Sequence, residues 1–170
     1  MKNIYLIGMM GSGKTSTARE LAKLHRNFSA VDFDELIQKE TGKTISQIFK
    51  EHGQDAFREF EGKVLDKVVE SSSPVIASTG GGIVITPRYV ELMQSHGTLI
   101  YLKTSFPVLW ERVKHSKARP LLQTDSPEET FLSIFKDRTP IYETIANYIV
   151  ETDGKTPAEV AKEISERFFK

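Results

Sequence analysis

The sequence contains no cysteine, which excludes disulfides, thiolate nucleophiles and thiolate metal sites and is compatible with a reducing compartment. It has no excess of charge either, because 23 lysines and arginines balance 23 aspartates and glutamates. No net field therefore favours a nucleic acid or an anionic membrane surface. No apolar run approaches the roughly 20 residues that span a bilayer. These absences predict a soluble, cytoplasmic protein with no nucleic-acid or membrane partner.

The octapeptide at residues 8–15, Gly-Met-Met-Gly-Ser-Gly-Lys-Thr, fits the phosphate-binding pattern G-x-x-x-x-G-K-[S/T] and follows an apolar run at 4–7. A Gly-rich turn between strand and helix directs backbone N–H groups inward, and the helix adds the positive end of its dipole. The Lys14 ammonium can reach the β- and γ-phosphates, and the Thr15 hydroxyl can ligate Mg²⁺. The loop predicts nucleoside triphosphate chemistry. Because it begins at Gly8, we expect no signal or transit peptide before it.

A length of 170 residues predicts one domain covering 1–170. Apolar runs and segments with helical periodicity alternate along it. Buried strands are predicted at 4–7, 75–77, 99–102 and 148–150, with a weaker one at 30–31. Helices are predicted at 15–25, 34–40, 45–51, 56–69, 87–95, 107–114, 128–145 and 157–169. This alternation is typical of an α/β fold with helices on both faces of a parallel sheet. The prolines, serines and basic residues of 114–127 predict an exposed loop.

In open α/β sheets the ligand lies at the carboxyl ends of the strands, and two aspartates follow the second apolar run. Asp32 is the best candidate for the outer shell of a metal ion, since the strand at 75–77 ends in Ser78 and Thr79 without an acid. Asp34 would then face the acceptor and orient or deprotonate the hydroxyl that attacks the γ-phosphate. The alternative is that Asp34 only caps the helix that follows.

Three glycines at residues 80–82 follow the third strand. They would let a substrate approach backbone N–H groups, and a flexible turn is the simpler alternative. Positive charge for a phosphoryl group and for an anionic acceptor could come from Arg58, Arg119 or Arg138. Taken singly, each is the kind of residue that is solvated at the surface. Sequence spacing alone does not bring the three together.

Taken jointly, these segments resemble the shikimate kinase family, small P-loop kinases that phosphorylate the 3-hydroxyl of shikimate with Mg²⁺-ATP. The resemblance covers nearly the whole chain, in family order and spacing. It rests on Gly8 to Thr15, Asp32-Phe33-Asp34, Phe57-Arg58 with Glu61, Gly80 to Gly82, Arg119-Pro120-Leu121-Leu122 and Arg138-Thr139-Pro140-Ile141-Tyr142. It implies a three-layer αβα P-loop fold with a five-stranded parallel sheet, a helical substrate-binding region at about 32–61 and a mobile lid at about 114–126.

The resemblance also implies roles for individual residues. The catalytic residues would be Lys14, Asp34 as the base and Arg119, which would swing from the lid toward the transferred phosphoryl group. Shikimate would be bound by Asp34, by the carboxylate clamp of Arg58 and Arg138, and by the backbone of Gly80, Gly81 and Gly82. ATP would be bound by Gly11, Ser12, Gly13, Lys14, Thr15, Ser16 and Arg119, with adenine between Arg112 and Pro157. Mg²⁺ would be ligated by Thr15 and supported through water by Asp32.

Other functions stay open at the level of sequence. Another small-metabolite kinase, such as a gluconate-type enzyme, would share the phosphate loop and lid without needing Asp34, Arg58 and Arg138 as a set. A non-catalytic ATP-binding regulator could share the fold, although an intact Lys14 argues against decay. A nucleic-acid-binding P-loop protein is disfavoured by zero net charge and the lack of a basic stripe. No apolar patch can be recognised, so we expect a monomer.

Overall fold

The computed structural model describes residues 2–169. Strands β1 (Asn3–Ile7), β2 (Ser29–Asp32), β3 (Val75–Ser78), β4 (Gly97–Lys103) and β5 (Tyr148–Glu151) form a parallel sheet in the order β2-β3-β1-β4-β5. The helices are α1 (Lys14–Leu24), α2 (Phe33–Thr41), α3 (Ile45–Glu70), α4 (Pro87–His96), α5 (Phe106–Val113), α6 (Pro127–Ile145) and α7 (Pro157–Phe168), with 3₁₀ turns η1 (Ile83–Ile85) and η2 (Pro120–Leu122). The predicted five-stranded α/β fold is confirmed. Within residues 2–169, no helix has the length and apolarity needed to cross a bilayer.

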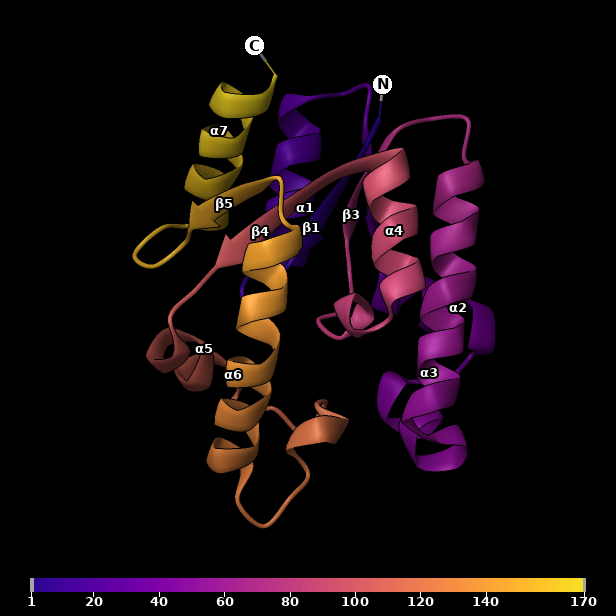
Figure 1. Ribbon diagram of the computed structural model, residues 1–170, viewed down its shortest axis with the longest axis vertical. Helices are drawn as coiled ribbons and strands as arrows, with labels where there is room; N and C mark the ends of the chain where they lie inside the picture. The colour runs from indigo at the N-terminus through magenta and orange to yellow at the C-terminus, as the bar shows by residue number, and fades with distance from the viewer. Residues whose placement is uncertain (1, 170) are drawn as a thin grey trace.

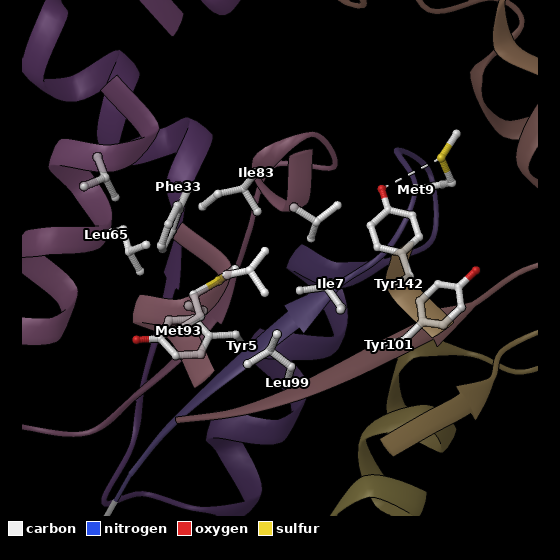
Figure 2. Close-up of a cluster of buried hydrophobic side chains, with 14 of the residues drawn as sticks. Tyr5, Ile7, Met9, Phe33, Leu65, Ile83, Met93, Leu99, Tyr101 and Tyr142 are labelled. Atoms are coloured by element: carbon white, nitrogen blue, oxygen red, sulfur yellow. Dashed lines mark hydrogen bonds between the residues drawn. The ribbon is translucent and has the colours of Figure 1, made fainter. Parts of the chain in front are cut away.

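Helices cover both faces of the sheet (Figure 1). Successive residues of the central strand β1 point to opposite faces, since Tyr5 and Ile7 join one buried cluster and Ile4 and Leu6 join the other. Helices α2 to α6 contribute to the first cluster, and α1 and α7 to the second. Figure 2 shows the first cluster, in which Met93 of α4 lies over the sheet. Because both faces of β1 are buried, a ligand can approach this strand only at its end.

The predicted helices at 45–51 and 56–69 belong to one element, α3, which is interrupted at Gly53. The φ of 81° and ψ of 179° at Gly53 are not helical, and a residue with a side chain rarely adopts that φ. The helix begins with a capping box, in which the side chains of Thr44 and Gln47 each accept a hydrogen bond from the other residue's backbone N–H. The break separates two parts of α3 that line the same cavity, described below.

The segment at 114–127 is largely the exposed loop that the sequence predicted, with one buried exception. It contains the turn η2, whose last residue, Leu122, is 5% exposed and belongs to the first hydrophobic cluster. The sequence did not predict this one anchor, because a single buried residue in an aperiodic segment leaves no periodic signal. The position of Arg119, directly before η2, is consequently tied to the core.

Candidate active site

The phosphate loop leaves the carboxyl end of β1 and leads into α1. Gly13 is the N-cap of α1 with a left-handed φ of 90°, and a Cβ on Gly11 would lie 2.9 Å from a side-chain carbon of α5. Glycine is therefore required once for conformation and once for close approach. The Nζ atom of Lys14 donates hydrogen bonds to the carbonyl oxygens of Gly8 and Met9, each at 2.9 Å. The ammonium is thus held against the loop.

Lys14 is 8% exposed, and its surroundings contain charges of both signs. The pKa of Lys14 is lowered to about 8, chiefly by burial and also by repulsion from the nearby Arg119. The carboxylates of Asp34 and Asp32 oppose the shift. The predicted phosphate, base, lid and metal residues therefore share one electrostatic neighbourhood.

Asp32, at the carboxyl end of β2, makes two hydrogen bonds. Its Oδ2 accepts from the hydroxyl of Thr15 at 2.5 Å, and its Oδ1 accepts from the backbone N–H of Glu35 at 3.1 Å as the N-cap of α2. The Oγ of Ser78 lies 3.1 Å from the Oγ1 of Thr15, because the parallel register pairs Ser78 with Asp32. Asp32 and not Asp34 caps the helix, so the alternative interpretation of Asp34 is wrong. The side chains of Thr15, Asp32 and Ser78 thus form a compact group of oxygen atoms that could ligate a cation.

A cavity beside the phosphate loop brings together residues that are far apart in the sequence. Its lining comes from the phosphate loop, from α2, α3 and α6, from the end of β3 and from the start of η2. The lining residues are Met10, Asp34, Ile45, Phe49, Phe57, Arg58, Glu61, Gly80, Gly81, Gly82, Ala118, Arg119, Pro120, Leu121 and Arg138. Every residue predicted to bind the acceptor lines this space, and we call it the acceptor cavity.

Asp34 lies in the first turn of α2, and its Oδ1 atom is buried with no hydrogen-bond partner among the described residues. Burial raises the pKa of Asp34, and the neighbouring Asp32 raises it further. The cations Lys14, Arg119 and Arg58 oppose this shift. A carboxylate with a free oxygen and an increased proton affinity is suited to receive a proton from a hydroxyl group.

Arg58 is held by a buried carboxylate to which the sequence alone assigned no role. The Nη1 of Arg58 donates to Oε2 of Glu61, three residues further along α3, at 2.5 Å. The Glu61 side chain is fully buried and that of Arg58 is 13% exposed, so neither is a solvated surface residue. Burial raises the pKa of Glu61 to about 7, although Arg58 opposes the shift. The signal that could have identified Glu61 is the i, i+3 spacing in a predicted helix.

The missing side chains of the glycine triplet make room for this pair. A Cβ on Gly80 would overlap the Oε1 of Glu61, and a Cβ on Gly82 would overlap the guanidinium of Arg58. The triplet was expected to leave backbone open to a substrate. All three glycines line the acceptor cavity, and Glu61 and Arg58 occupy the space that a Cβ would fill at Gly80 and Gly82. Contact between this backbone and a substrate stays a prediction.

Arg138 enters the acceptor cavity from α6 and is only 5% exposed. A Cβ on Gly81 would lie 3.5 Å from its Nη1 atom. Further along α6, the buried hydroxyl of Tyr142 donates to the carbonyl of Gly81 at 2.5 Å and is directed toward the sulfur of Met9 at 3.9 Å (Figure 2). Helix α6 is thereby fixed to both the glycine triplet and the phosphate loop.

A second cavity of about 440 Å³ opens over the phosphate loop. It is lined by Gly11, Ser12, Gly13, Thr15, Ser16, Thr17, Arg112, Arg119, Thr152, Lys155, Pro157 and Val160. The Nη1 of Arg112 donates to the carbonyl of Gly11 at 2.9 Å, which fixes α5 against the loop. All residues predicted to bind the nucleotide except the inward-pointing Lys14 line this nucleotide cavity. Lys155 is a further cation that sequence reasoning missed, and Arg119 lines both cavities.

A parallel sheet with a phosphate loop after its first strand, a nucleotide cavity over that loop and an adjoining acceptor cavity define a small P-loop kinase. Comparison with known proteins makes this more specific. The model of the shikimate kinase family matches residues 10–168, and the chain belongs to this family.

Individual relatives agree with this assignment over nearly their full lengths. The chain is 40% identical over 168 residues to the shikimate kinase of Thermodesulfovibrio yellowstonii, covering 99% of this chain and 95% of that protein. It is 42% identical over 164 residues to the shikimate kinase of Legionella pneumophila, covering 96% and 93%. The solved structure of the Acinetobacter baumannii shikimate kinase in complex with shikimate superposes with a TM-score of 0.92 at 34% identity, covering 99% of this chain and 93% of that one.

Proposed function

We propose that this protein transfers the γ-phosphoryl group of ATP to the 3-hydroxyl of shikimate, forming shikimate 3-phosphate and ADP as a step of chorismate and aromatic amino acid biosynthesis. The observation that carries the proposal is that Arg119 lines both cavities, beside Lys14 and Asp34. A donor over the phosphate loop and an acceptor in the adjoining cavity would meet at this guanidinium. Membership in the family supports shikimate as the acceptor.

The acceptor cavity suits a small hydroxylated carboxylate. Arg58 and Arg138 reach it from different helices and offer guanidinium forks, which bind a planar carboxylate in a bidentate manner. Asp34 offers a carboxylate oxygen for a hydroxyl group. The rings of Phe49 and Phe57 provide apolar contact for the carbon skeleton.

The nucleotide cavity suits ATP and a divalent cation. The loop N–H groups and Lys14 would hold the phosphates, and Arg112 and Pro157 would flank the adenine. The oxygens of Thr15 and Asp32 are of the kind that Mg²⁺ takes in phosphoryl-transfer sites, with Thr15 as a ligand and Asp32 acting through water. When bound, Mg²⁺ neutralises charge on the β- and γ-phosphates.

In this mechanism the residues of the chain position the reactants and move one proton. The 3-hydroxyl oxygen attacks the γ-phosphorus, the bond from phosphorus to the β–γ bridging oxygen breaks, and the hydroxyl proton passes to Asp34. The raised pKa of Asp34 suits it to this acceptance. Because the transition state is loose, charge stabilisation by Lys14 and Arg119 matters more than a strong base. Closure of the lid at 114–126 would exclude water and suppress ATP hydrolysis.

The test is ADP release with Mg²⁺-ATP against shikimate, quinate, gluconate and nucleoside monophosphates, with a reaction lacking acceptor as the baseline. Turnover selective for shikimate and lost in Asp34→Asn is the expected result. Turnover with gluconate alone would keep the fold and contradict the carboxylate clamp formed by Arg58 and Arg138. ATP binding without turnover of any acceptor would favour the regulator. Three expectations stay predictions: the single domain, the monomeric state and the cytoplasmic location. Light scattering during gel filtration measures the oligomeric state.

A further inference from the structure

Helices α3 and α4 interlock on the acceptor side of the sheet, where they lie side by side (Figure 1). Side chains of α3 enter the spaces left by the glycine triplet, as described above. In the opposite direction, Tyr89 of α4 enters a space left by Gly62 of α3. A Cβ on Gly62 would lie 2.7 Å from Cζ and 2.8 Å from Cε1 of the tyrosine ring. The hydroxyl of Tyr89 donates a hydrogen bond to the main-chain carbonyl of Arg58 at 2.9 Å.

The presence of glycine at position 62 is explained by packing and not by backbone conformation. Gly62 lies inside α3 and is absent from the glycines with positive φ, so any residue could adopt its conformation. Glycine in a helix interior weakens the helix relative to alanine. The approach of the Tyr89 ring is the feature of the structure that excludes a side chain at this position.

The contact fixes Arg58 at its main chain, while Glu61 fixes its guanidinium. Helix α4 follows the glycine triplet through η1, so the bond from Tyr89 ties the Arg58 turn of α3 to the helix that continues from the triplet, and α3 and the triplet both line the acceptor cavity. Burial raises the pKa of Tyr89, which keeps the hydroxyl protonated and able to donate. Tyr89 itself is not among the residues that line either cavity.

We propose that Tyr89 is a positioning residue that sets the place of Arg58 for the acceptor carboxylate by holding the Arg58 turn of α3 against α4. The inference rests on the proposed function and deepens it. Because the bond acts on one wall of the acceptor cavity, its loss affects binding of shikimate and leaves binding of ATP unchanged.

Removal of the hydroxyl is the first test. Tyr89→Phe should raise the KM for shikimate about three- to tenfold, the effect of one lost hydrogen bond, with kcat and the KM for ATP within about twofold of wild type. Tyr148→Phe is the matched control, because Tyr148 lies on the edge strand β5 and is 45% exposed. A wild-type KM for shikimate in Tyr89→Phe, or equal changes in both KM values, would overturn the inference.

A double-mutant cycle tests the contact without relying on the hydroxyl. Gly62→Ala should raise the KM for shikimate and lower the melting temperature, since the new Cβ displaces the Tyr89 ring although alanine favours the helix. In a Tyr89→Ala background the ring is gone, so the same change should raise the melting temperature and leave the KM where Tyr89→Ala sets it. Additive effects in the cycle would overturn the inference.

The two proposals fail in distinguishable ways. If the wild-type protein does not phosphorylate shikimate, the proposed function falls. The melting temperatures of the cycle need no substrate and still decide whether Tyr89 occupies the space above Gly62. If shikimate is phosphorylated and the cycle is additive, the function stands and the positioning role of Tyr89 falls.

Discussion

Replacement of Glu61 by glutamine should change how the stability of the protein depends on pH. The folded protein holds the Glu61 proton up to about pH 7, whereas the unfolded chain releases it near the ordinary value of 4.5. Between these values the folded state binds more protons than the unfolded state, so the free energy of unfolding falls as the pH rises. The contribution of the protonated carboxyl is fully present below pH 4.5 and is lost as the pH rises through about 7.

The magnitude follows from the size of the pKa shift. A rise from 4.5 to about 7 corresponds to about 3 kcal/mol in total at roughly 1.4 kcal/mol per unit, of which about 2 kcal/mol falls between pH 5 and pH 8. Solvent screening does not reduce this amount, because the side chain of Glu61 is fully buried. Glutamine has the same shape and cannot ionise. The melting temperature of wild type minus that of Glu61→Gln should therefore fall by roughly 4–8 °C from pH 5 to pH 8.

The assay is thermal unfolding followed by circular dichroism at constant ionic strength across this pH range. Glu59→Gln is the matched control, because Glu59 is exposed on the same helix and its loss removes one carboxylate from the surface. A plot of its melting temperature against pH should run parallel to that of wild type. If the melting temperature of Glu61→Gln also ran parallel to that of wild type, the reasoning would be refuted. If the melting temperature of wild type minus that of Glu61→Gln rose with pH, attraction to Arg58 would outweigh burial.

Three further changes test the site. Arg119→Ala should lower kcat about 10³- to 10⁵-fold while the Kd for shikimate measured by calorimetry changes little, because the arginine lines both cavities and is proposed to stabilise the transferred group; unchanged turnover would remove this role. Arg58→Lys should raise the KM for shikimate about tenfold or more, since an ammonium cannot form the guanidinium fork, and an unaltered KM would count against the clamp. Asp32→Asn should raise the Mg²⁺ concentration for half-maximal activity about 10- to 100-fold with little loss of stability, because asparagine also caps helices; an identical Mg²⁺ titration would contradict the metal assignment.

The parts of this fold that could be predicted are those with local signals. The phosphate loop is contiguous, and the apolar runs at 4–7 and 99–102 are bounded by polar turns, so β1 and β4 are apparent without a structure. The weaker run at 30–31 is part of β2. It could be predicted because it lies where the alternation of strands and helices calls for a strand, directly before Asp32. Proline in the first turn likewise placed the starts of α4 and α7.

The parts that could not be predicted depend on contacts between distant segments. Burial of Glu61 against Gly80 requires that α3 and the turn after β3 lie at a particular distance, which no residue of either segment specifies alone. The same holds for Gly62, which looks like a defect in a helix until Tyr89 is placed beside it. Sequence reasoning therefore named residues that line both cavities, and Glu61 among the family motifs, but it assigned no positioning role to Glu61 or Tyr89.

The anchoring of η2 restricts how the segment at 114–126, the proposed lid, can move. The carbonyl of Arg119 accepts a hydrogen bond from the N–H of Leu122 at 3.0 Å, and Leu122 is buried in the core. Burial of a leucine side chain contributes about 1.5–3 kcal/mol, so a conformation that lifts Leu122 out of the core would be populated at only about 1–10% on this ground alone. The residues at 117–118 and 123–126, before and after η2, are exposed, so their motion uncovers no buried side chain. The side chain of Arg119, proposed to stabilise the transferred phosphoryl group, thus starts from the anchored part of the proposed lid, which favours its preorganisation between the two cavities.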